Sequence, residues 1–509
     1  MVQVLTPRMS RGFSWGWCLV AALATFPPSV FGQGGVGKGD AKKAATPANA
    51  KKANAKDEVE EDVVAKPEGS GVVDAPQMKR LETNEIFKDP RAEKAIANTF
   101  AEIPAPQGAL TATDISSLKN MASGLQAPDP GLITRAVDIQ AAAMTSRKNI
   151  KYVIGPPPGV GPKSETLRAI EKASQTLVDL LVTAREKKND AFLAVYRPIL
   201  FAKLQPLLSN HLFARMQASI ILATAATPNT IDVFNKQLSD PKQVVWVKLW
   251  SARGISIATQ DGRITPDVVK ATAAAAALVG FLDQEPDAPW PVKVRALEAL
   301  GNLRLASTLG PQGKPDVIAA VARFLCDDKE KLEVRAWAAW SLGMIPVPSS
   351  QASFNFPLVA YKIGRLALEI GEKIGEEYDL LEKDFTKRSD YARFLTGLLL
   401  YQVDPALSGE SEIQGAGLLK MRHNALGPVQ PFLKGLDEEL KGLSRESIAL
   451  LRAGGNETKG VRKEIAARVA SLSSYLDKNR PADAPLYPGG PKFPLAPAAQ
   501  VAGGPAPAK

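Results

Sequence analysis

Side chains that commonly carry out catalysis are scarce in this sequence. Its 509 residues include two histidines, His211 and His423, and two cysteines, Cys18 and Cys326. Because Cys18 lies in the apolar stretch near the N-terminus, the rest of the chain cannot assemble a His/Cys zinc cluster, and neither histidine stands in a Gly-x-Ser-x-Gly context. Acidic residues are plentiful, but no spacing singles out a catalytic pair. We therefore expect both histidines at the surface, no metal, no cofactor and no enzymatic activity.

One stretch imitates a phosphate-binding loop. Residues 149–167, NIKYVIGPPPGVGPKSETL, combine an apolar run, a glycine-rich turn and a following helix. A phosphate loop needs an adjacent Gly-Lys pair and a row of free backbone N–H groups. Here Pro162 separates Gly161 from Lys163, and the prolines at 156–158 remove donors. We interpret the stretch as a connector that ends at a helix start.

The charge of the chain is positive but dilute. The formal net charge is +10 at pH 7, and removal of Arg8 and Arg11 with an N-terminal signal would leave about +8. A nucleic-acid-binding surface usually has a dense Lys/Arg stripe with interleaved aromatic residues, and no such stripe is present. The sequence therefore predicts that nucleic acid is not a partner.

The N-terminus has the pattern of an export signal. Residues 9–32 place Arg11 before an apolar run that ends in two prolines and the small Gly32. The run at 15–26 is shorter than the roughly 20 apolar residues that a spanning helix needs, and no later stretch is long and apolar enough. We expect a signal peptide at 1–32, a periplasmic or extracellular location, and no transmembrane segment in the mature chain.

Low-complexity segments flank a region with helical periodicity. Residues 33–105 are predicted to be a disordered tether, and the Pro/Ala/Gly-rich residues 481–509 a disordered tail. Between them, apolar residues recur at helical spacing and alternating strand patterns are nearly absent, so the predicted fold class is all-α. We divide this region into N-terminal helices at 106–188, repeats at 189–345 and divergent or capping helices at 346–480.

A repeated pattern runs through the middle of the chain. The stretch VKVRALEALGNL at 292–303 returns as VRAWAAWSLGMI at 334–345, an offset of 42 residues. Weaker copies begin at Val247 and Ala214, at offsets of 45 and 33. A turn with Asp or Asn and another apolar helix precede each copy. The repeating unit is therefore predicted to be a helix-turn-helix of about 40 residues.

The pattern resembles the second helix of the HEAT-repeat family, Val-Arg-x-x-Ala-Ala-x-Ala-Leu-Gly-x-Leu, whose units stack into a curved α-solenoid. The resemblance covers residues 189–345 and implies an α-solenoid there. It also implies that the basic residue at position 2 of each copy holds a turn Asp or Asn of its own or a neighbouring repeat. These basic residues are Arg215, Lys248, Lys293 and Arg335, and the expected partners are Asn210, Asp240, Asp287 and Asp327. Further structural positions are Leu300 and Leu342 in the core and Gly301 and Gly343 at the helix exits.

A surface is predicted on the second helices of the repeats. At about 100° per residue, positions 1, 5, 9 and 12 of the pattern face the core, and position 7 points nearly opposite. Position 7 is held by Ile220, Arg253, Glu298 and Trp340, and Leu249 stands at position 3 of its copy. Because Trp and Arg are enriched among interface anchors, we expect this row to bind another protein. The alternative is that helices after residue 350 cover Trp340, which then belongs to the core.

Together these patterns predict an exported, non-catalytic HEAT-repeat scaffold whose partner is another protein. Two alternatives stay open. The chain could be an enzyme or an enzyme subunit, since the HEAT-like family includes relatives of phycobilin lyases, or it could attach to the cell envelope through its lysine-rich tether. Attachment needs a stronger charge than residues 38–74 supply, because seven lysines there face eight acidic residues.

Overall fold

The structure is a computed structural model of the chain, and the part that it describes is built from helices. The described residues are 89–97, 101–154, 168–260, 267–310, 313–383, 390–409, 415–453 and 457–495. No strand occurs in these ranges, which confirms the predicted all-α fold for them. They all belong to one unit, Asp89–Lys509. The predicted signal peptide and residues 33–88 of the predicted tether lie outside the described residues.

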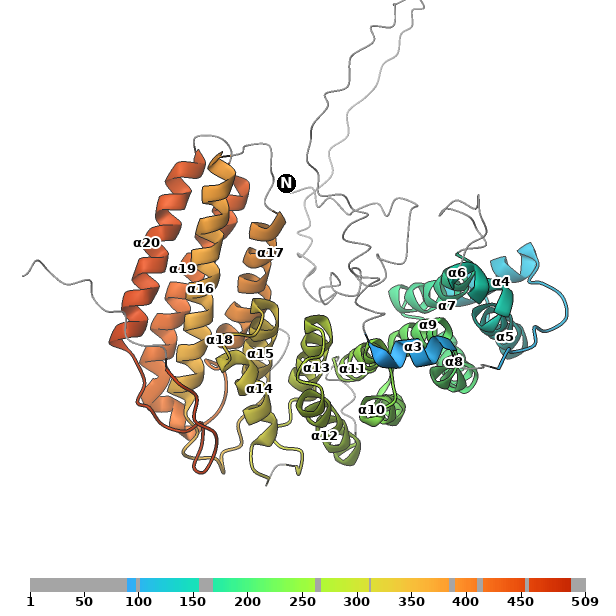
Figure 1. The fold of residues 1–509 in the computed structure, drawn as a ribbon, viewed down its shortest axis with the longest axis horizontal. Coiled ribbons are helices and arrows are strands. Elements are labelled where there is room, and N and C mark those ends of the chain that lie inside the picture. The colour runs from blue at the N-terminus through green and yellow to red at the C-terminus, as the bar shows by residue number, and fades with distance from the viewer. Residues whose placement is uncertain are drawn as a thin grey trace, which may run out of the picture. The chain divides into compact units, whose positions relative to one another are not determined.

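Four helices form the region before the repeats (Figure 1). They are α4 (Ala112–Ala122), α5 (Pro130–Thr145), α6 (Arg147–Ile154) and α7 (Ala169–Glu186). Polar side chains cap the N-termini of two of these helices. Thr111 and Asp114 form a capping box at α4, and the Asp129 carboxylate accepts backbone N–H groups at the start of α5. Helix α7 packs against α5 and against the first repeats.

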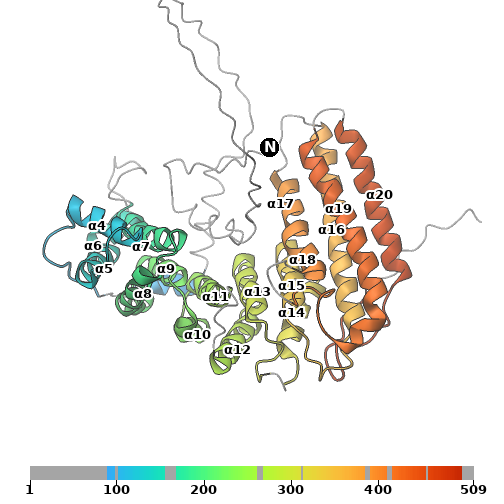
Figure 2. The same cartoon turned by 180° about the vertical axis from the view of Figure 1, so that it is seen from behind.

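The region with the repeated pattern contains pairs of helices (Figures 1 and 2). The helices are α8 (Asp190–Leu204), α9 (Leu212–Thr224), α10 (Ile231–Ser239), α11 (Val245–Thr259), α12 (Val268–Gln284), α13 (Trp290–Leu303), α14 (Asp316–Cys326) and α15 (Leu332–Met344). The helices that carry the pattern, α9, α11, α13 and α15, pack in chain order, each against the next. Helices α10, α12 and α14 pack beside them. Leu300 and Leu342 lie in the core between these helices.

One helical stretch among the described residues, Asp190–Ser209, is long and apolar enough to cross a membrane by length and composition. A core helix of a soluble protein meets the same test. In this stretch Phe192, Tyr196 and Leu200 are buried, and the Tyr196 hydroxyl donates to the Leu177 carbonyl at 3.0 Å. The absence of a transmembrane segment therefore stays a prediction.

Two glycines of the repeated pattern allow close packing between neighbouring segments. A Cβ atom on Gly301 would lie 2.5 Å from the Trp340 ring, and one on Gly343 would lie 2.5 Å from the Ala406 carbonyl oxygen. Neither glycine has the positive φ of a helix-ending residue, and Arg304 takes that conformation after α13 with φ 56°. Both glycines lie in the last turn of their helices, where they make room for neighbouring segments and do not reverse the chain.

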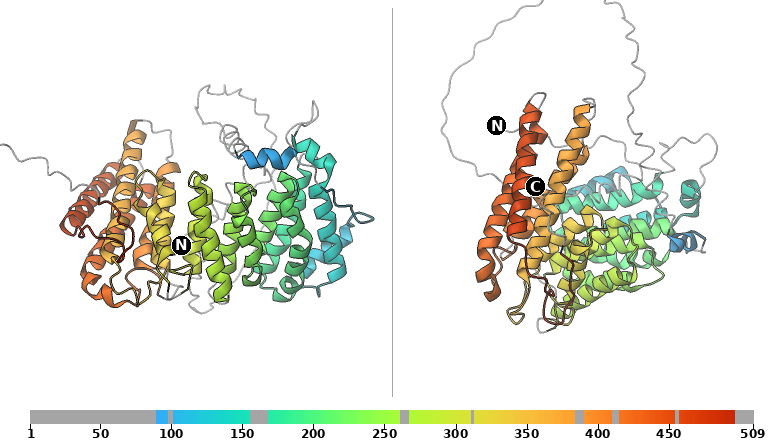
Figure 3. Two further views of the ribbon diagram at one scale, coloured as in Figure 1. Left: turned by 60° about the horizontal axis from the view of Figure 1, so that its bottom comes forward. Right: turned by 60° about the vertical axis from the view of Figure 1, so that its left-hand side comes forward.

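The C-terminal region contains a long helix and two shorter partners that lie side by side (Figure 3). Its helices are α16 (Phe356–Lys383), α17 (Asp390–Leu398), the π-helical η4 (Leu399–Val403), α18 (Asp404–Ser408), α19 (Gln430–Arg452) and α20 (Glu457–Lys478). Helices α16, α19 and α20 pack against one another, and α17 packs against α16 and α19. Gly364 and Gly371 of α16 lie close to apolar side chains of both α19 and α20.

Two segments that were predicted to be disordered are folded. Residues Pro90–Ala97 form helix α3, with Ala92 and Ala95 buried. Residues 481–495 lie on the folded unit, where Leu486 is fully buried and its carbonyl accepts the backbone N–H of Asn355 at 2.9 Å. Composition predicted disorder for both segments, but a few apolar side chains and specific hydrogen bonds are sufficient to order them.

Replacement of Gly343 by alanine should lower the free energy of unfolding by about 1–3 kcal/mol, because the added methyl group meets backbone atoms that cannot rotate away. Gly280→Ala in α12 is the matched control, since no described atom outside its own helix lies within 4 Å of a Cβ there. The control should raise stability by up to about 1 kcal/mol through helix propensity. Urea unfolding followed by circular dichroism measures both, and equal effects of the two substitutions would contradict the close packing.

Candidate functional site

The row of residues expected at the surface is mostly buried. Trp340 is 6% exposed, Glu298 4% and Leu249 2%. The Arg253 side chain is 12% exposed, and Ile220 is half-buried. The exposure predicted for this row is therefore wrong, and the reason for assigning it to a partner protein is lost.

A loop that follows the repeats covers Trp340. The Trp340 ring packs against Ala416 and against the ring of Trp337, which lies edge-on at 5.3 Å between centroids. The backbone N–H of Gly417 donates to the Gly343 carbonyl at 2.8 Å, which fixes this loop to the end of α15. The alternative that later residues cover Trp340 is confirmed by Ala416, which lies in a loop, and Gly301 of α13 also lies against the ring.

Arg253 and Glu298 belong to a buried ionic cluster between α11 and α13. The Arg253 guanidinium donates to one oxygen of Glu298, and the Arg295 guanidinium donates to the other at 2.6 Å. Burial acts to raise the pKa of Glu298, but the two guanidiniums hold that pKa below its ordinary value. Glu298 is therefore the ionised counter-ion of both arginines, and the cluster joins two neighbouring helices.

The basic residues at position 2 link each repeat to the next. Lys248 Nζ donates to Glu285 Oε1 and Lys293 Nζ donates to Glu330 Oε2, both at 2.6 Å. Each glutamate lies 37 residues after its lysine, in the turn that precedes the next second helix. We call these pairs, together with Arg335 and Glu369, the ion-pair ladder.

The basic residues at the two ends of the repeats, Arg335 and Arg215, each bind their own turn and the segment that follows. At the C-terminal end, Arg335 donates to Glu369 of α16 at 2.6 Å and to Asp328 of its own turn at 3.3 Å. At the N-terminal end of the repeats, Arg215 donates to the backbone carbonyl of Asn210 in its own turn and to the Gln243 side chain in the turn before α11 at 3.4 Å. The position-2 residues therefore hold turns at both ends, as the resemblance implies.

The acids of the ladder are not the expected aspartates. The Asp240 carboxylate accepts the backbone N–H of Lys242 at 2.8 Å, and the Asp327 carboxylate accepts that of Lys329 at 3.0 Å. These short side chains stabilise their own turns. The longer glutamates of the next unit bind the lysines instead, so the resemblance implied the right kind of contact with the wrong acid.

Helix α3 is attached to the repeats by a second set of charges. One Asp89 oxygen accepts the backbone N–H of Val245 at the start of α11 at 2.8 Å, and the other accepts from Arg91. Arg91 also donates to both oxygens of Glu285, the ladder acid of Lys248. Burial acts to raise the pKa of Glu285, but the hydrogen bonds from Arg91 and Lys248 hold it below its ordinary value. Glu285 therefore joins three helices as a carboxylate.

Both histidines act as helix caps. His211 is 1% exposed, its Nδ1 accepts the backbone N–H of Phe213 at 3.4 Å, and its ring also bonds the backbone of Ile96 in α3. His423 is half-buried, and its Nδ1 accepts a backbone N–H at 3.1 Å. The predicted surface position is wrong for His211. Burial, and then the charge of Arg215, lower the pKa of His211, while the bond to Ile96 acts in the opposite direction.

The described residues contain no group of three or more His, Cys, Asp and Glu side chains that could hold a metal ion. Cys326 is buried, and burial raises the pKa of its thiol to about 12. A thiol with this pKa stays protonated at neutral pH and is a poor nucleophile.

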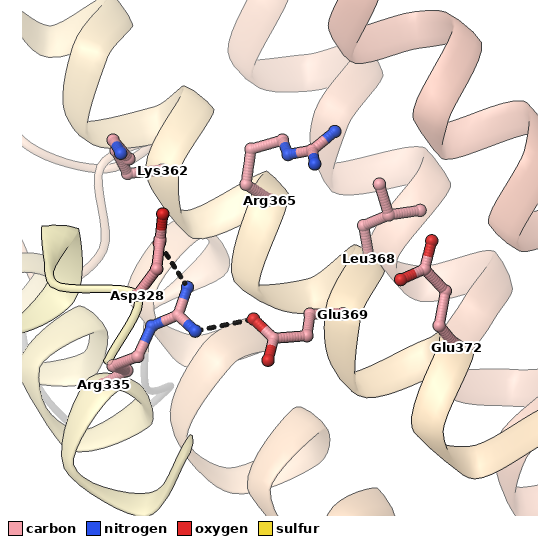
Figure 4. A pocket seen from close by; sticks show the side chains of 7 residues that line it. All are labelled: Asp328, Arg335, Lys362, Arg365, Leu368, Glu369 and Glu372. Atoms are coloured by element: carbon pink, nitrogen blue, oxygen red, sulfur yellow. Dashed lines mark hydrogen bonds and ion pairs between the residues drawn. The ribbon is translucent and has the colours of Figure 1, made fainter. Parts of the chain in front are cut away.

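The C-terminal end of the ladder borders a charged pocket of about 260 Å³ (Figure 4). It lies between the turn before α15 and one face of α16. Its lining residues are Asp328, Arg335, Lys362, Arg365, Leu368, Glu369 and Glu372. Three cations and three acids thus surround the space, and Figure 4 shows Arg335 bound to two of the acids. Sequence reasoning found Arg335 but none of the lining residues from α16.

An exposed aromatic stripe on α17 and η4 also escaped the sequence analysis. Tyr391, Phe394 and Tyr401 are 45%, 40% and 37% exposed. The rings of Tyr391 and Phe394 are stacked, with centroids 6.2 Å apart and planes at 19°. The helical spacing of these aromatic residues is a sequence signal for a shared face. They lie outside residues 189–345, where a binding surface was predicted.

Comparison with known proteins identifies no relative of this chain. No protein-family model matches it, and no curated protein and no solved structure matches it either.

Trp340→Ala should lower the free energy of unfolding by about 3–5 kcal/mol, because it removes a buried ring and leaves a cavity. Leu125→Ala is the control, since Leu125 is 81% exposed and its loss should change stability by less than about 0.5 kcal/mol. Thermal melts of both variants measure the difference. A Trp340→Ala chain that melts like wild type would show that the ring is not part of the core.

The lowered pKa of His211 predicts a loss of stability in mild acid. The unfolded chain binds the proton more readily than the folded one, so the contribution of neutral His211 is complete above its ordinary pKa of 6.5 and is lost as the pH falls below that value. His211→Asn keeps a side-chain acceptor for the helix cap but does not titrate. Unfolding free energies at pH 7.5 and 5.5 should differ less for this variant than for wild type. Identical differences would exclude His211 as the titrating group.

Proposed function

We propose that the chain is an exported, non-catalytic α-solenoid scaffold of HEAT-like repeats that binds another protein. The architecture is supported by the chain-order packing of α9, α11, α13 and α15 and by the ion-pair ladder that couples each unit to the next. In such repeat stacks each unit contacts its neighbours, and the stack offers an extended surface for binding. The proposed export rests on the sequence pattern of residues 1–32.

The aromatic stripe is the observation that carries the binding role. Exposed aromatic side chains are enriched among the residues that anchor protein interfaces. Burial, and then the negative charges of Glu333, Glu377 and Glu369, raise the pKa of the Tyr391 phenol, so acidic side chains contribute to the field at this surface. A protein segment with Lys or Arg beside apolar side chains complements this surface, since its cations can bind both the carboxylates and the ring faces.

The test compares partners captured by three versions of the mature chain. Tyr391→Ala combined with Phe394→Ala removes the stacked pair, and Leu125→Ala removes a more exposed apolar side chain elsewhere. The double variant should weaken binding of the captured protein by about thirtyfold or more, because loss of an interface anchor typically costs about 2 kcal/mol. The Leu125→Ala chain should bind like wild type.

Two further measurements make the comparison decisive. Melting temperatures of all three chains should be similar, since the substituted residues are exposed, and binding should weaken as salt is raised. Capture that survives the double substitution would show that the stripe is not the binding surface. A partner that binds equally well at low and high salt would remove the role of the carboxylates.

A further inference from the structure

Two cations of the charged pocket, Lys362 and Arg365, form no ion pair in the part of the chain that the structure describes. Lys362 is 5% exposed and Arg365 is half-buried. Neither forms a hydrogen bond or an ion pair through its side chain with another residue in the part of the chain that the structure describes. Figure 4 shows both on α16, with the paired Asp328, Arg335 and Glu369 beside them. Lys362 is therefore a largely buried lysine side chain that lines the pocket and has no ion-pair partner among the described residues.

The acids of the pocket are already in use. Asp328 and Glu369 each accept a hydrogen bond from Arg335, and both lie within ion-pair distance of its guanidinium. Glu372 is exposed at the rim of the lining. A buried cation without a counter-ion is costly, so most buried charges in proteins are paired. An anion in the pocket would supply the missing partner of Lys362.

The lining also selects the charge and the size of that anion. The charges of its three cations and three acids sum to zero. A ligand with a second negative charge would therefore be repelled by the acids of the lining, which only Arg335 neutralises. The volume of about 260 Å³ is smaller than the roughly 300–1,000 Å³ of sites for drug-sized ligands. A planar carboxylate can accept two parallel N–H groups from an arginine fork and one from a lysine.

We propose that the pocket between α15 and α16 binds a single carboxylate group through Lys362 and Arg365. The carboxylate belongs either to a small free acid or to an acidic side chain of another protein. This inference does not depend on the aromatic stripe, because the free acid tests it without any protein partner.

The experiment uses the full chain and three probes. Acetate, compared with chloride at constant ionic strength, represents the free acid. The peptide N-acetyl-Ala-Glu-Ala-amide represents a side chain, and its Gln counterpart lacks the charge. Acetate binding is measured as the rise in melting temperature with concentration, and peptide binding by calorimetric titration.

Lys362→Met is the main variant, because it keeps the apolar stem, removes the unpaired charge and should leave the fold intact. It should weaken carboxylate binding by at least about tenfold, since hydrogen bonds to charged groups contribute at that level. Arg365→Gln should act in the same direction, and Glu372→Gln should strengthen binding by removing a negative charge. Lys373→Met, on the same helix outside the pocket lining, should change nothing.

The outcomes separate the two sources of the carboxylate. A Lys362-dependent effect of acetate with no preference for the Glu peptide supports a small free acid. Lys362-dependent binding of the Glu peptide over the Gln peptide supports an acidic side chain. The proposal is overturned if neither probe binds wild type, or if binding is unchanged in both Lys362→Met and Arg365→Gln.

Discussion

The two inner second helices of the repeats, α11 and α13, each lie between two others and must match both neighbours. Helices α11 and α13 each pack against the second helix before and the second helix after them in the chain. This constraint explains why Gly301 is needed beneath the Trp340 ring and why Glu298 of α13 binds Arg253 of the neighbouring α11 as well as Arg295 of its own helix. Polar groups at such a boundary are tolerated only when their hydrogen bonds are satisfied within it.

The same constraint separates what the sequence predicts from what it does not. Periodicity located the helices and the all-α class, because a 3.6-residue period is a local property of the chain. The prediction for position 7 assumed that each repeat is a pair of helices with one face of its second helix free of contacts. In the structure that face meets neighbouring helices at Arg253 and Glu298, and at Trp340 it meets a loop about seventy residues further along the chain.

Sites that form between distant segments have no local signature. Lys362 and Arg365 are ordinary positions of an amphipathic helix until α16 is placed against Arg335. Composition had a related limit. It averaged over residues 33–105 and 481–509 and so missed short folded pieces, where Asp89 and Leu486 make specific contacts. His211 was likewise misplaced because its bond to Ile96 depends on α3, which lies in a segment predicted to be disordered.

The attachment of α3 determines where mechanical load would enter the folded unit. Asp89 binds the first turn of α11, and Arg91 binds Glu285 before α13, whereas the chain itself continues to α4. A pull on the chain ahead of residue 89 would therefore reach the middle of the repeats directly, through Asp89 and Arg91, as well as α9 through the bond between His211 and Ile96. The helices α4 to α7 would stay outside this path, shielded by ion pairs that must break first.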